Sequence, residues 1–173
     1  MQKLKLIGLM ICCLVAGVIT AKIFFITENP EFKVAQSRSH TLPSITVFNL
    51  ASEAVNLSED LSLDTINVII IYTLGCNSCI SKADTWSEIY SSTKDVVNFL
   101  GLAYSSDREA VRSFIRSSGL DFEHRLIDQH NANKIQINDW PTILGLDGNS
   151  NLLFKYEGGA STDSLISYLS YNI

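Results

Sequence analysis

The sequence has little positive charge. Only 13 of its 173 residues are Lys or Arg, against 18 Asp and Glu, so the formal net charge is −5. Three of the basic residues, Lys3, Lys5 and Lys22, lie in the first 26 positions, which leaves 10 basic and 18 acidic residues from position 27 onward, a net charge of −8. An acidic domain without a basic cluster repels a phosphate backbone, so nucleic acid is not an expected partner.

The sequence also lacks long low-complexity tracts and internal repeats. Charged residues are few, at 18%, whereas apolar residues make up 46%. Such a composition can fill a hydrophobic core and argues against a disordered chain. The length suits one compact domain preceded by a short extra segment.

The N-terminal segment predicts a membrane anchor over residues 1–26. Lys3 and Lys5 precede an apolar run, Leu6–Ile26, that is 21 residues long. A helix of this length spans the hydrocarbon core of a bilayer. Positive charge before the run, with Glu28 and Glu31 after it, favours an N-inside orientation. The domain would then face the periplasm or another compartment outside the cytoplasm.

A cleaved signal peptide is the alternative for this segment. Ala21 is a small residue at a possible cleavage point, but the apolar run continues through residues 23–26. A lipoprotein is disfavoured because the bulky Ile11 precedes Cys12. Cys12 and Cys13 are interpreted as ordinary apolar residues of the span.

The rest of the chain predicts one α/β domain over residues 42–173, after a polar linker at 27–41. The β-branched run 67–74 is typical of a strand buried on both faces, and a helix is expected over 77–93. Residues 106–109 form a capping box for a second helix. Further strands are expected at 44–50, 55–57, 96–103, 124–127, 142–146 and 152–156, with helices at 131–137 and after Ser161 or Thr162, the last with Leu165, Ile166 and Leu169 inward.

The chemistry-bearing motif is Cys76-Asn77-Ser78-Cys79, which lies between the buried strand and the expected helix. The free N–H groups and the positive dipole end of a helix stabilise a thiolate at this position. Cys76 would be exposed at the helix tip, and Cys79 would lie one turn on, along the apolar stripe. Such a dithiol attacks a substrate disulfide through Cys76 and resolves the mixed disulfide through Cys79.

Two interpretations of the motif that involve no disulfide exchange remain open, a structural disulfide and a metal site. A structural disulfide would have no need of a strand-to-helix location. A zinc or copper site would need more ligands than one CxxC supplies, and His124 and His130 are the candidates. We interpret each of these histidines as a surface residue, so no metal ligand is assigned.

Trp140-Pro141 opens the expected strand at 142–146, a position where proline is tolerated. We expect a cis bond before Pro141, which would be a deliberate feature. A trans-proline turn is the alternative, since cis is a minority of X–Pro bonds. The cis form would place Pro141 across a shallow groove from the cysteine pair. It would also leave the Trp140 backbone free to pair with an extended substrate segment.

Residues 42–173 resemble the TlpA/ResA-like branch of membrane-anchored thioredoxin-like proteins. The matching segments are the hairpin around 42–58, the strand and motif NVIIIYTLGCNSC (67–79), the insertion at 101–128, and NDWPTILGLDGNSNLLFKYEGG (138–159). The resemblance implies a thioredoxin-like fold with a mixed sheet flanked by helices, an N-terminal hairpin and one transmembrane helix. It also implies reduction of protein disulfides outside the cytoplasm, with electrons drawn from a membrane thiol carrier and passed to substrates such as apocytochrome c, and with no cofactor.

The sequence departs from this family at several positions. Gly75, Asn77 and Ser78 replace the usual tryptophan and the proline of the motif. Ile70 stands where thioredoxins keep a buried aspartate, and Lys82 where the reductases carry an acid. No buried carboxylate is therefore predicted to take the proton from Cys79, a step on which the direction and rate of exchange depend.

Two other functions compete with disulfide exchange. A peroxiredoxin has a threonine three residues before its cysteine, as Thr73 is here, but Ile69 stands where that motif has proline. A copper chaperone like the Sco proteins has a CxxxC motif, one residue longer than this one, together with a distant histidine. Copper titration with a His124→Ala control would distinguish a copper chaperone from a disulfide-exchange protein.

Overall fold

The computed structural model describes residues 41–173. The predicted anchor at 1–26 and all but the last residue of the predicted linker at 27–41 lie outside this part of the chain. No helix within residues 41–173 has both the length and the apolar composition needed to cross a bilayer.

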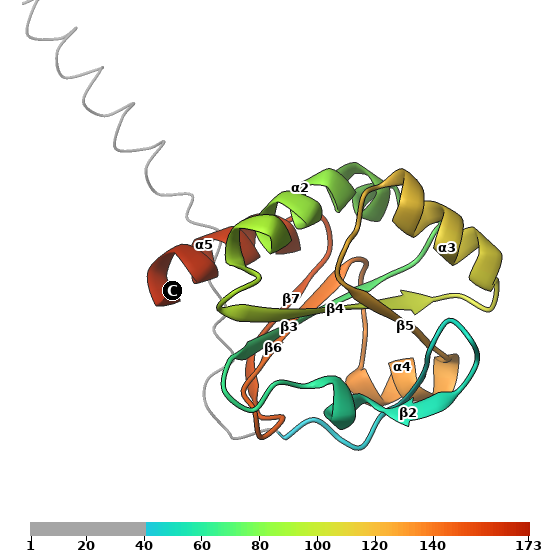
Figure 1. The fold of residues 1–173 in the computed structure, drawn as a ribbon, viewed down its shortest axis with the longest axis horizontal. Coiled ribbons are helices and arrows are strands. Elements are labelled where there is room, and N and C mark those ends of the chain that lie inside the picture. The colour runs from blue at the N-terminus through green and yellow to red at the C-terminus, as the bar shows by residue number, and fades with distance from the viewer. Residues whose placement is uncertain (1–40) are drawn as a thin grey trace, which may run out of the picture. The chain divides into compact units, whose positions relative to one another are not determined.

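The described residues form one seven-stranded mixed sheet with the strand order β2-β1-β5-β4-β3-β6-β7 (Figure 1). Strands β3, β4 and β5 are parallel, and the remaining pairs are antiparallel. The elements are β1 Thr46–Phe48, β2 Ala54–Asn56, the 3-10 helix η1 Leu57–Asp60, β3 Ile66–Tyr72, α2 Asn77–Thr93, β4 Val97–Tyr104, α3 Arg108–Ser117, β5 Glu123–Ile127, α4 Gln129–Ile135, β6 Thr142–Leu146, β7 Leu152–Glu157 and α5 Ser161–Asn172.

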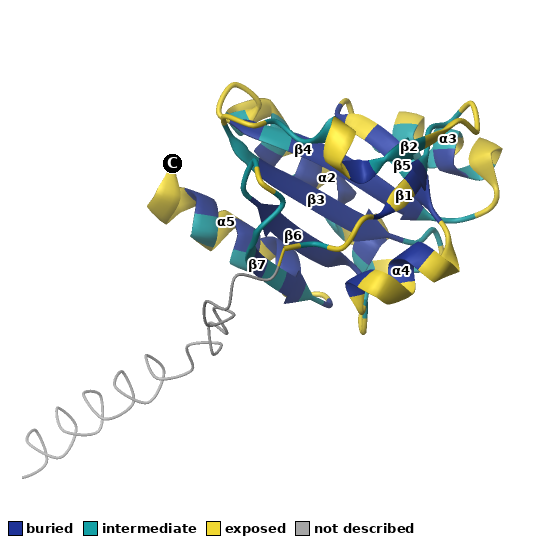
Figure 2. Cartoon of the chain, turned by 90° about the horizontal axis from the view of Figure 1, so that it is seen from below, coloured by how far each residue is buried: buried dark blue, intermediate teal, exposed yellow. Residues whose placement is uncertain are grey.

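The central strand β3 separates two apolar clusters. Its side chains alternate, so that Ile70 and Tyr72 pack with the cluster that includes α2 and α5, whereas Ile69 and Ile71 pack with the one that includes α4. In Figure 1, α2, α3 and α5 lie on one side of the sheet and α4 on the other. Figure 2 shows the middle strands as almost wholly buried. Burial on both faces explains why the sequence of this strand is a continuous run of β-branched residues instead of an alternation of apolar and polar ones.

The start of α3 differs from the expected capping box. Asp107 is the N-cap, and its carboxylate accepts a hydrogen bond from the Ala110 N–H at 3.0 Å. The predicted cap, Ser106, is therefore wrong by one residue. Aspartate caps a helix as well as serine does, and Asp107 directly follows Ser106. The end of α3 agrees with expectation, since Gly119 has φ of +58°, the left-handed conformation that follows many helix ends.

The last helix also departs from expectation at two points. Its N-cap is Ala160, which forms no side-chain cap, and both Ser161 and Thr162 are buried inside the first turn. Leu165 and Leu169 are buried as predicted, but Ile166 is 41% exposed. A surface helix packed on a sheet buries only a narrow stripe of its side chains. Leu165 and Leu169 belong to this stripe, whereas Ile166 lies beside it.

His124, which we interpreted as a surface residue, is buried in the core of β5. Its Nδ1 lies 3.0 Å from the Tyr72 hydroxyl, and its ring stacks on Phe122. The neighbouring strand makes room through Gly101, where a Cβ would lie only 2.2 Å from that nitrogen. Burial lowers the pKa of His124 to about 4, with a smaller opposing effect from the Leu120 backbone.

We therefore expect His124 to destabilise the fold in acid. Between pH 6.5 and 4 the unfolded chain binds a proton at His124 that the folded chain does not, so the free energy of unfolding falls as the pH falls. The expected loss from this group is about 2 to 3 kcal/mol between pH 7.5 and 4.5. Urea unfolding of the wild type and His124→Asn at both pH values would measure it, because asparagine cannot titrate.

His130 supplies the matched control for this experiment, since its side chain is exposed. The His130→Asn variant should keep the pH dependence of the wild type, whereas His124→Asn should lose much of it. Equal pH dependence in all three proteins would contradict a buried neutral imidazole at position 124.

Candidate active site

Cys76 is held at the N-terminus of α2 by the strand that precedes it. Strand β3 ends at Tyr72, and a short turn, closed by the Cys76 N–H donating to the Thr73 carbonyl at 3.2 Å, leads into the helix. Cys76 is the N-cap residue, and its sulfur accepts a hydrogen bond from the Cys79 N–H at 3.0 Å. A thiolate formed on this sulfur would thus be stabilised by a helix-terminal N–H group and by the helix dipole.

Cys76 and Cys79 form a disulfide with a Cα–Cα distance of 5.2 Å. Cys79 is fully buried, whereas Cys76 is half-buried at the helix tip. These exposures agree with the expected order of attack, in which Cys76 meets the substrate first. The order itself stays a prediction.

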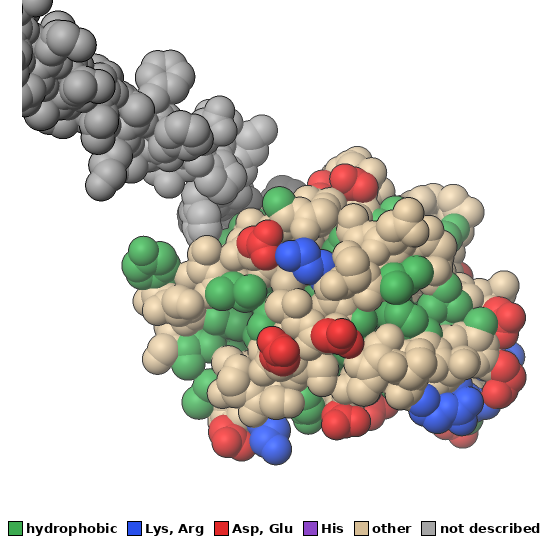
Figure 3. Space-filling model, turned by 90° about the horizontal axis from the view of Figure 1, so that it is seen from above, with side chains coloured by type: hydrophobic (Ala, Val, Ile, Leu, Met, Phe, Trp, Pro, Cys, Tyr) green, Lys and Arg blue, Asp and Glu red, His purple; other side chains and the backbone are tan. Residues whose placement is uncertain are grey.

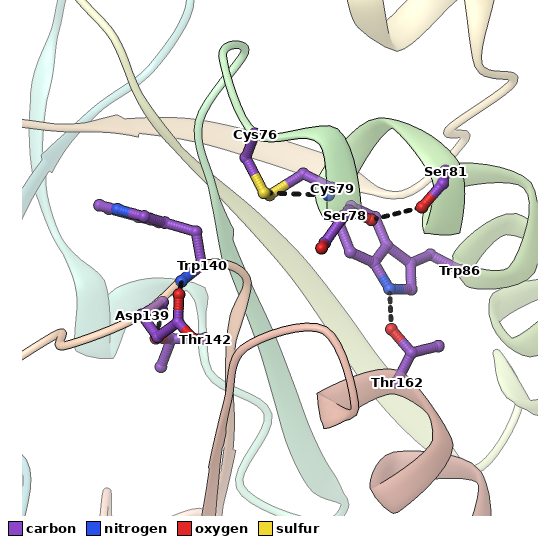
Figure 4. Close-up of a disulfide and its surroundings, with 9 residues drawn as sticks. All are labelled: Cys76, Ser78, Cys79, Ser81, Trp86, Asp139, Trp140, Thr142 and Thr162. Atoms are coloured by element: carbon purple, nitrogen blue, oxygen red, sulfur yellow. Dashed lines mark hydrogen bonds between the residues drawn. A yellow bond between two sulfur atoms is a disulfide. The ribbon is translucent and has the colours of Figure 1, made fainter.

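Trp86 supports the buried side of the disulfide. Its side chain is fully buried, and its Nε1 donates a hydrogen bond of 2.8 Å to the Thr162 hydroxyl of α5 (Figure 4). Its ring centroid lies 6.1 Å from that of Tyr72. The tryptophan therefore ties α2, which carries both cysteines, to the last helix and to the central strand.

The surroundings of the pair contain few charges. The face formed by α2, α3 and α5 is mostly uncharged (Figure 3). Lys82, one turn beyond Cys79, pairs with Asp163 of α5 at 3.0 Å. Ile70 is fully buried in the strand before the motif. The buried polar side chains among residues 41–173 are Asn67, His124, Asn131, Thr142, Ser161 and Thr162, so none of these described groups is a carboxylate that could take the Cys79 proton.

The Trp140–Pro141 bond is cis, as the sequence analysis expected, and Pro141 directly precedes β6. The Trp140 backbone is less free than expected, because its N–H donates to Oδ1 of Asp139 at 2.8 Å. Only the carbonyl side of Trp140 is thus left to pair with a substrate. The acceptor is the side chain of the directly preceding residue, and the strand pattern in the sequence does not predict this local hydrogen bond.

The Trp140 indole lies on the opposite side of the disulfide from Trp86 (Figure 4). It stacks on Tyr104, with ring centroids 5.4 Å apart and planes inclined by 27°. Tyr104 ends β4, the strand next to β3, and was not among the predicted site residues. Its signal in the sequence was an aromatic residue at the carboxyl end of a predicted strand, where parallel strands bring side chains together.

The loop before α5 reaches the motif from a third direction. A Cβ on Gly159 would lie 3.3 Å from the Ser78 hydroxyl oxygen, so the Gly159 backbone approaches the Ser78 side chain closely. The adjacent Gly158 donates its N–H to the Pro141 carbonyl at 2.9 Å. This loop therefore links Ser78 of the motif to the cis-proline, which lie more than sixty positions apart in the sequence.

Metal ligands do not gather in the part of the chain that the structure describes. Within residues 41–173 no group of three or more His, Cys, Asp or Glu side chains is placed to hold an ion. Cys76 and Cys79 form a disulfide with each other, and His124, a candidate ligand of a copper site, is hydrogen-bonded to Tyr72 in the core.

No protein-family model and no curated protein matches the chain by sequence. Its fold is nevertheless shared with many solved structures. A thiol:disulfide interchange protein from Bacteroides sp. aligns with a TM-score of 0.67 and 16% identity, covering 79% of this chain and 90% of that one. A DsbF homologue from Corynebacterium diphtheriae aligns at 0.65 and 18%, covering 83% and 96%. A secreted Mycobacterium tuberculosis disulfide oxidoreductase homologous to E. coli DsbE aligns at 0.60 and 16%, covering 74% and 96%.

These likenesses establish the class of fold. Residues 41–173 have a thioredoxin-like α/β fold, with a mixed sheet, helices on both faces and an N-terminal β1–β2 hairpin, as the family resemblance implied. At identities of 18% or less they do not by themselves transfer an activity to this chain.

Proposed function

We propose that the chain is a protein thiol–disulfide oxidoreductase that works through Cys76 and Cys79. The observation that carries the proposal is the position of Cys76, which caps α2 with its sulfur on a backbone N–H while its partner cysteine is buried one turn away. The cis-Pro141 strand lies beside the loop that contacts the motif, which supports the same activity. The similar structures that are thiol:disulfide interchange proteins add further support.

Reduction of a substrate would proceed in two exchanges. The Cys76 thiolate attacks one sulfur of the substrate disulfide, forms a mixed disulfide and releases the other substrate sulfur as a thiolate. Cys79 then attacks the Cys76 sulfur, which closes the protein disulfide and releases the second substrate thiol. Two electrons pass from the protein to the substrate, and no cofactor takes part. With no buried carboxylate described near the pair, the Cys79 proton would leave to solvent or to the departing substrate thiolate.

The direction and the location belong to the same proposal. By its resemblance to TlpA/ResA-like proteins, the protein would be held at the cell membrane by residues 1–26, with its domain on the periplasmic side. It would act as a reductant, fed by a membrane thiol carrier, in a process such as cytochrome c maturation. The apolar run with lysines before it and acids after it supports this orientation.

Equilibration of the full-length protein with glutathione buffers tests the direction. We expect a reducing potential, close to that of thioredoxin at about −270 mV and far from that of the oxidant DsbA at about −120 mV. Reduction of a protein disulfide by the pre-reduced protein tests the activity itself. A potential near the oxidising end would instead make the protein a disulfide donor, and no reaction with either glutathione or protein would refute exchange.

A further inference from the structure

A cavity lies at the same edge of the sheet as the cysteine pair. It has a volume of about 660 Å³ and lies between the end of β4, the end of β5 and the β1 strand. Its apolar wall is formed by Phe48, Tyr104, Leu126 and Ile127. A volume of this size is typical of pockets that bury a ligand group.

We propose that this cavity is a subsite for a bulky apolar side chain of the polypeptide whose disulfide reacts at Cys76. The link between the two places is Tyr104, whose ring both lines the cavity and stacks on Trp140. Trp140 in turn lies beside the disulfide (Figure 4). The proposal rests on the exchange activity proposed above, since it needs a protein substrate at Cys76.

The register of the parallel strands sets the distance between the subsite and the end of β3, from which the chain continues into the cysteine motif. Tyr72 of β3 pairs with Ala103 of β4, and Tyr104 of β4 pairs with Ile127 of β5, so the three strands end at nearly the same level. From β3 to β5 is two strand spacings, roughly 10 Å. An extended peptide covers this distance in about three residues. The apolar side chain is therefore expected three positions from the reactive cysteine of the substrate.

The charges at the cavity favour an uncharged occupant. Its lining includes one cation, Arg108, and one anion, Asp128, together with serine hydroxyls. Asp128 is already engaged, because its carboxylate accepts hydrogen bonds from the backbone and side chain of Asn131. Because the lining carries one positive and one negative group, it gives no net attraction for a cationic or an anionic side chain. The apolar wall therefore determines which side chain binds.

Synthetic peptides with a single cysteine test the subsite. Each peptide carries glycine, aspartate or phenylalanine three positions before or after the cysteine and is presented as a mixed disulfide with thionitrobenzoate. The pre-reduced full-length protein attacks the peptide sulfur and releases the coloured thiolate, after which Cys79 frees the peptide thiol. We expect the phenylalanine peptide of one orientation to react about tenfold faster than its glycine counterpart, because an aromatic side chain leaves water.

A blocked cavity provides the second measurement. Ser106 lines the cavity and is exposed, so Ser106→Trp should fill the space without disturbing the core. We expect this variant to reduce the glycine peptide at the normal rate and to lose the preference for phenylalanine. Ser91→Trp is the matched control, because Ser91 is an exposed serine about 22 Å along α2 from Cys76. It should keep the preference.

The outcomes separate the two proposals. Equal rates for phenylalanine and glycine peptides in the unmodified protein would overturn the subsite while leaving the exchange activity intact. A preference that survives in Ser106→Trp, with the circular dichroism of the variant unchanged, would also overturn it, because the preference would then arise elsewhere. Failure to reduce even the glycine peptide would refute the proposed function instead. If Ser106→Trp does not fold, Ser106→Phe makes the same test with a smaller ring.

Discussion

The Cys76→Ser variant is expected to lose disulfide exchange altogether, whereas Cys79→Ser should accumulate mixed disulfides with its substrates. Of the two cysteines within residues 41–173, Cys76 is the one that combines partial exposure with a helix-terminal N–H on its sulfur, so its removal takes away the attacking group. We expect turnover to fall by roughly a thousandfold or more, as when a nucleophile is removed from an enzyme. Turnover of a protein disulfide in a reducing buffer measures the loss.

The fate of the Cys79→Ser variant makes the roles distinct. Cys79 is fully buried and can reach only the neighbouring sulfur, so without it the Cys76–substrate disulfide is not resolved. Non-reducing electrophoresis after incubation with substrate should show a covalent complex that reductant dissolves. The double variant, which lacks both cysteines of the motif but keeps Cys12 and Cys13, is the control and should form no complex. Complexes formed by Cys76→Ser instead would reverse the assignment of the two cysteines.

The largest effect on stability is expected from Trp86→Ala. The side chain is fully buried, contacts the Tyr72 ring and donates to Thr162, so its removal leaves a cavity beneath α2 and an unpaired hydroxyl. We expect the free energy of unfolding to fall by about 3 to 5 kcal/mol, the usual loss for an aromatic side chain truncated in a core. Urea unfolding of the oxidised protein, followed by circular dichroism, measures the change.

Two controls separate the parts of this effect. Trp140 is the only other tryptophan and is half-buried, so Trp140→Ala should cost much less than Trp86→Ala. Thr162→Val removes the hydrogen-bond acceptor while keeping the shape of the side chain, and should cost about 1 to 2 kcal/mol. A loss for Trp140→Ala as large as that for Trp86→Ala would contradict a core centred on Trp86.

Several parts of the site could be predicted because neighbouring residues determine them. The β-branched run 67–74 and the apolar stripe through Cys79 and Trp86 belong to one strand and one helix, so composition indicates the first and periodicity the second. The strand itself ends at Tyr72, two residues before the end of the run. The bounds of α2 and β6 agree with the expected ranges at both ends. The cis-Pro141 followed from the strand that it precedes and from the family resemblance.

Other features depended on contacts between distant segments. His124 has the polarity of a surface residue, and only Gly101 on the adjacent strand and the Tyr72 hydroxyl make its burial possible. Tyr104 joins the site because strand order places the end of β4 beside Trp140. Each of these contacts joins residues far apart in the sequence, so no local pattern could predict the contact itself.

The sequence by itself determined where the sulfur proposed to react lies, because adjacent residues place the CxxC motif between a buried strand and a helix. The tertiary structure decided what surrounds that sulfur. Packing of α5 on α2 paired Lys82 with Asp163, the loop at Gly159 closed on Ser78, and the parallel register aligned the apolar cavity with the motif. Each of these depends on the mutual placement of segments far apart in the chain, which is set by burial of the whole core and not by local propensity.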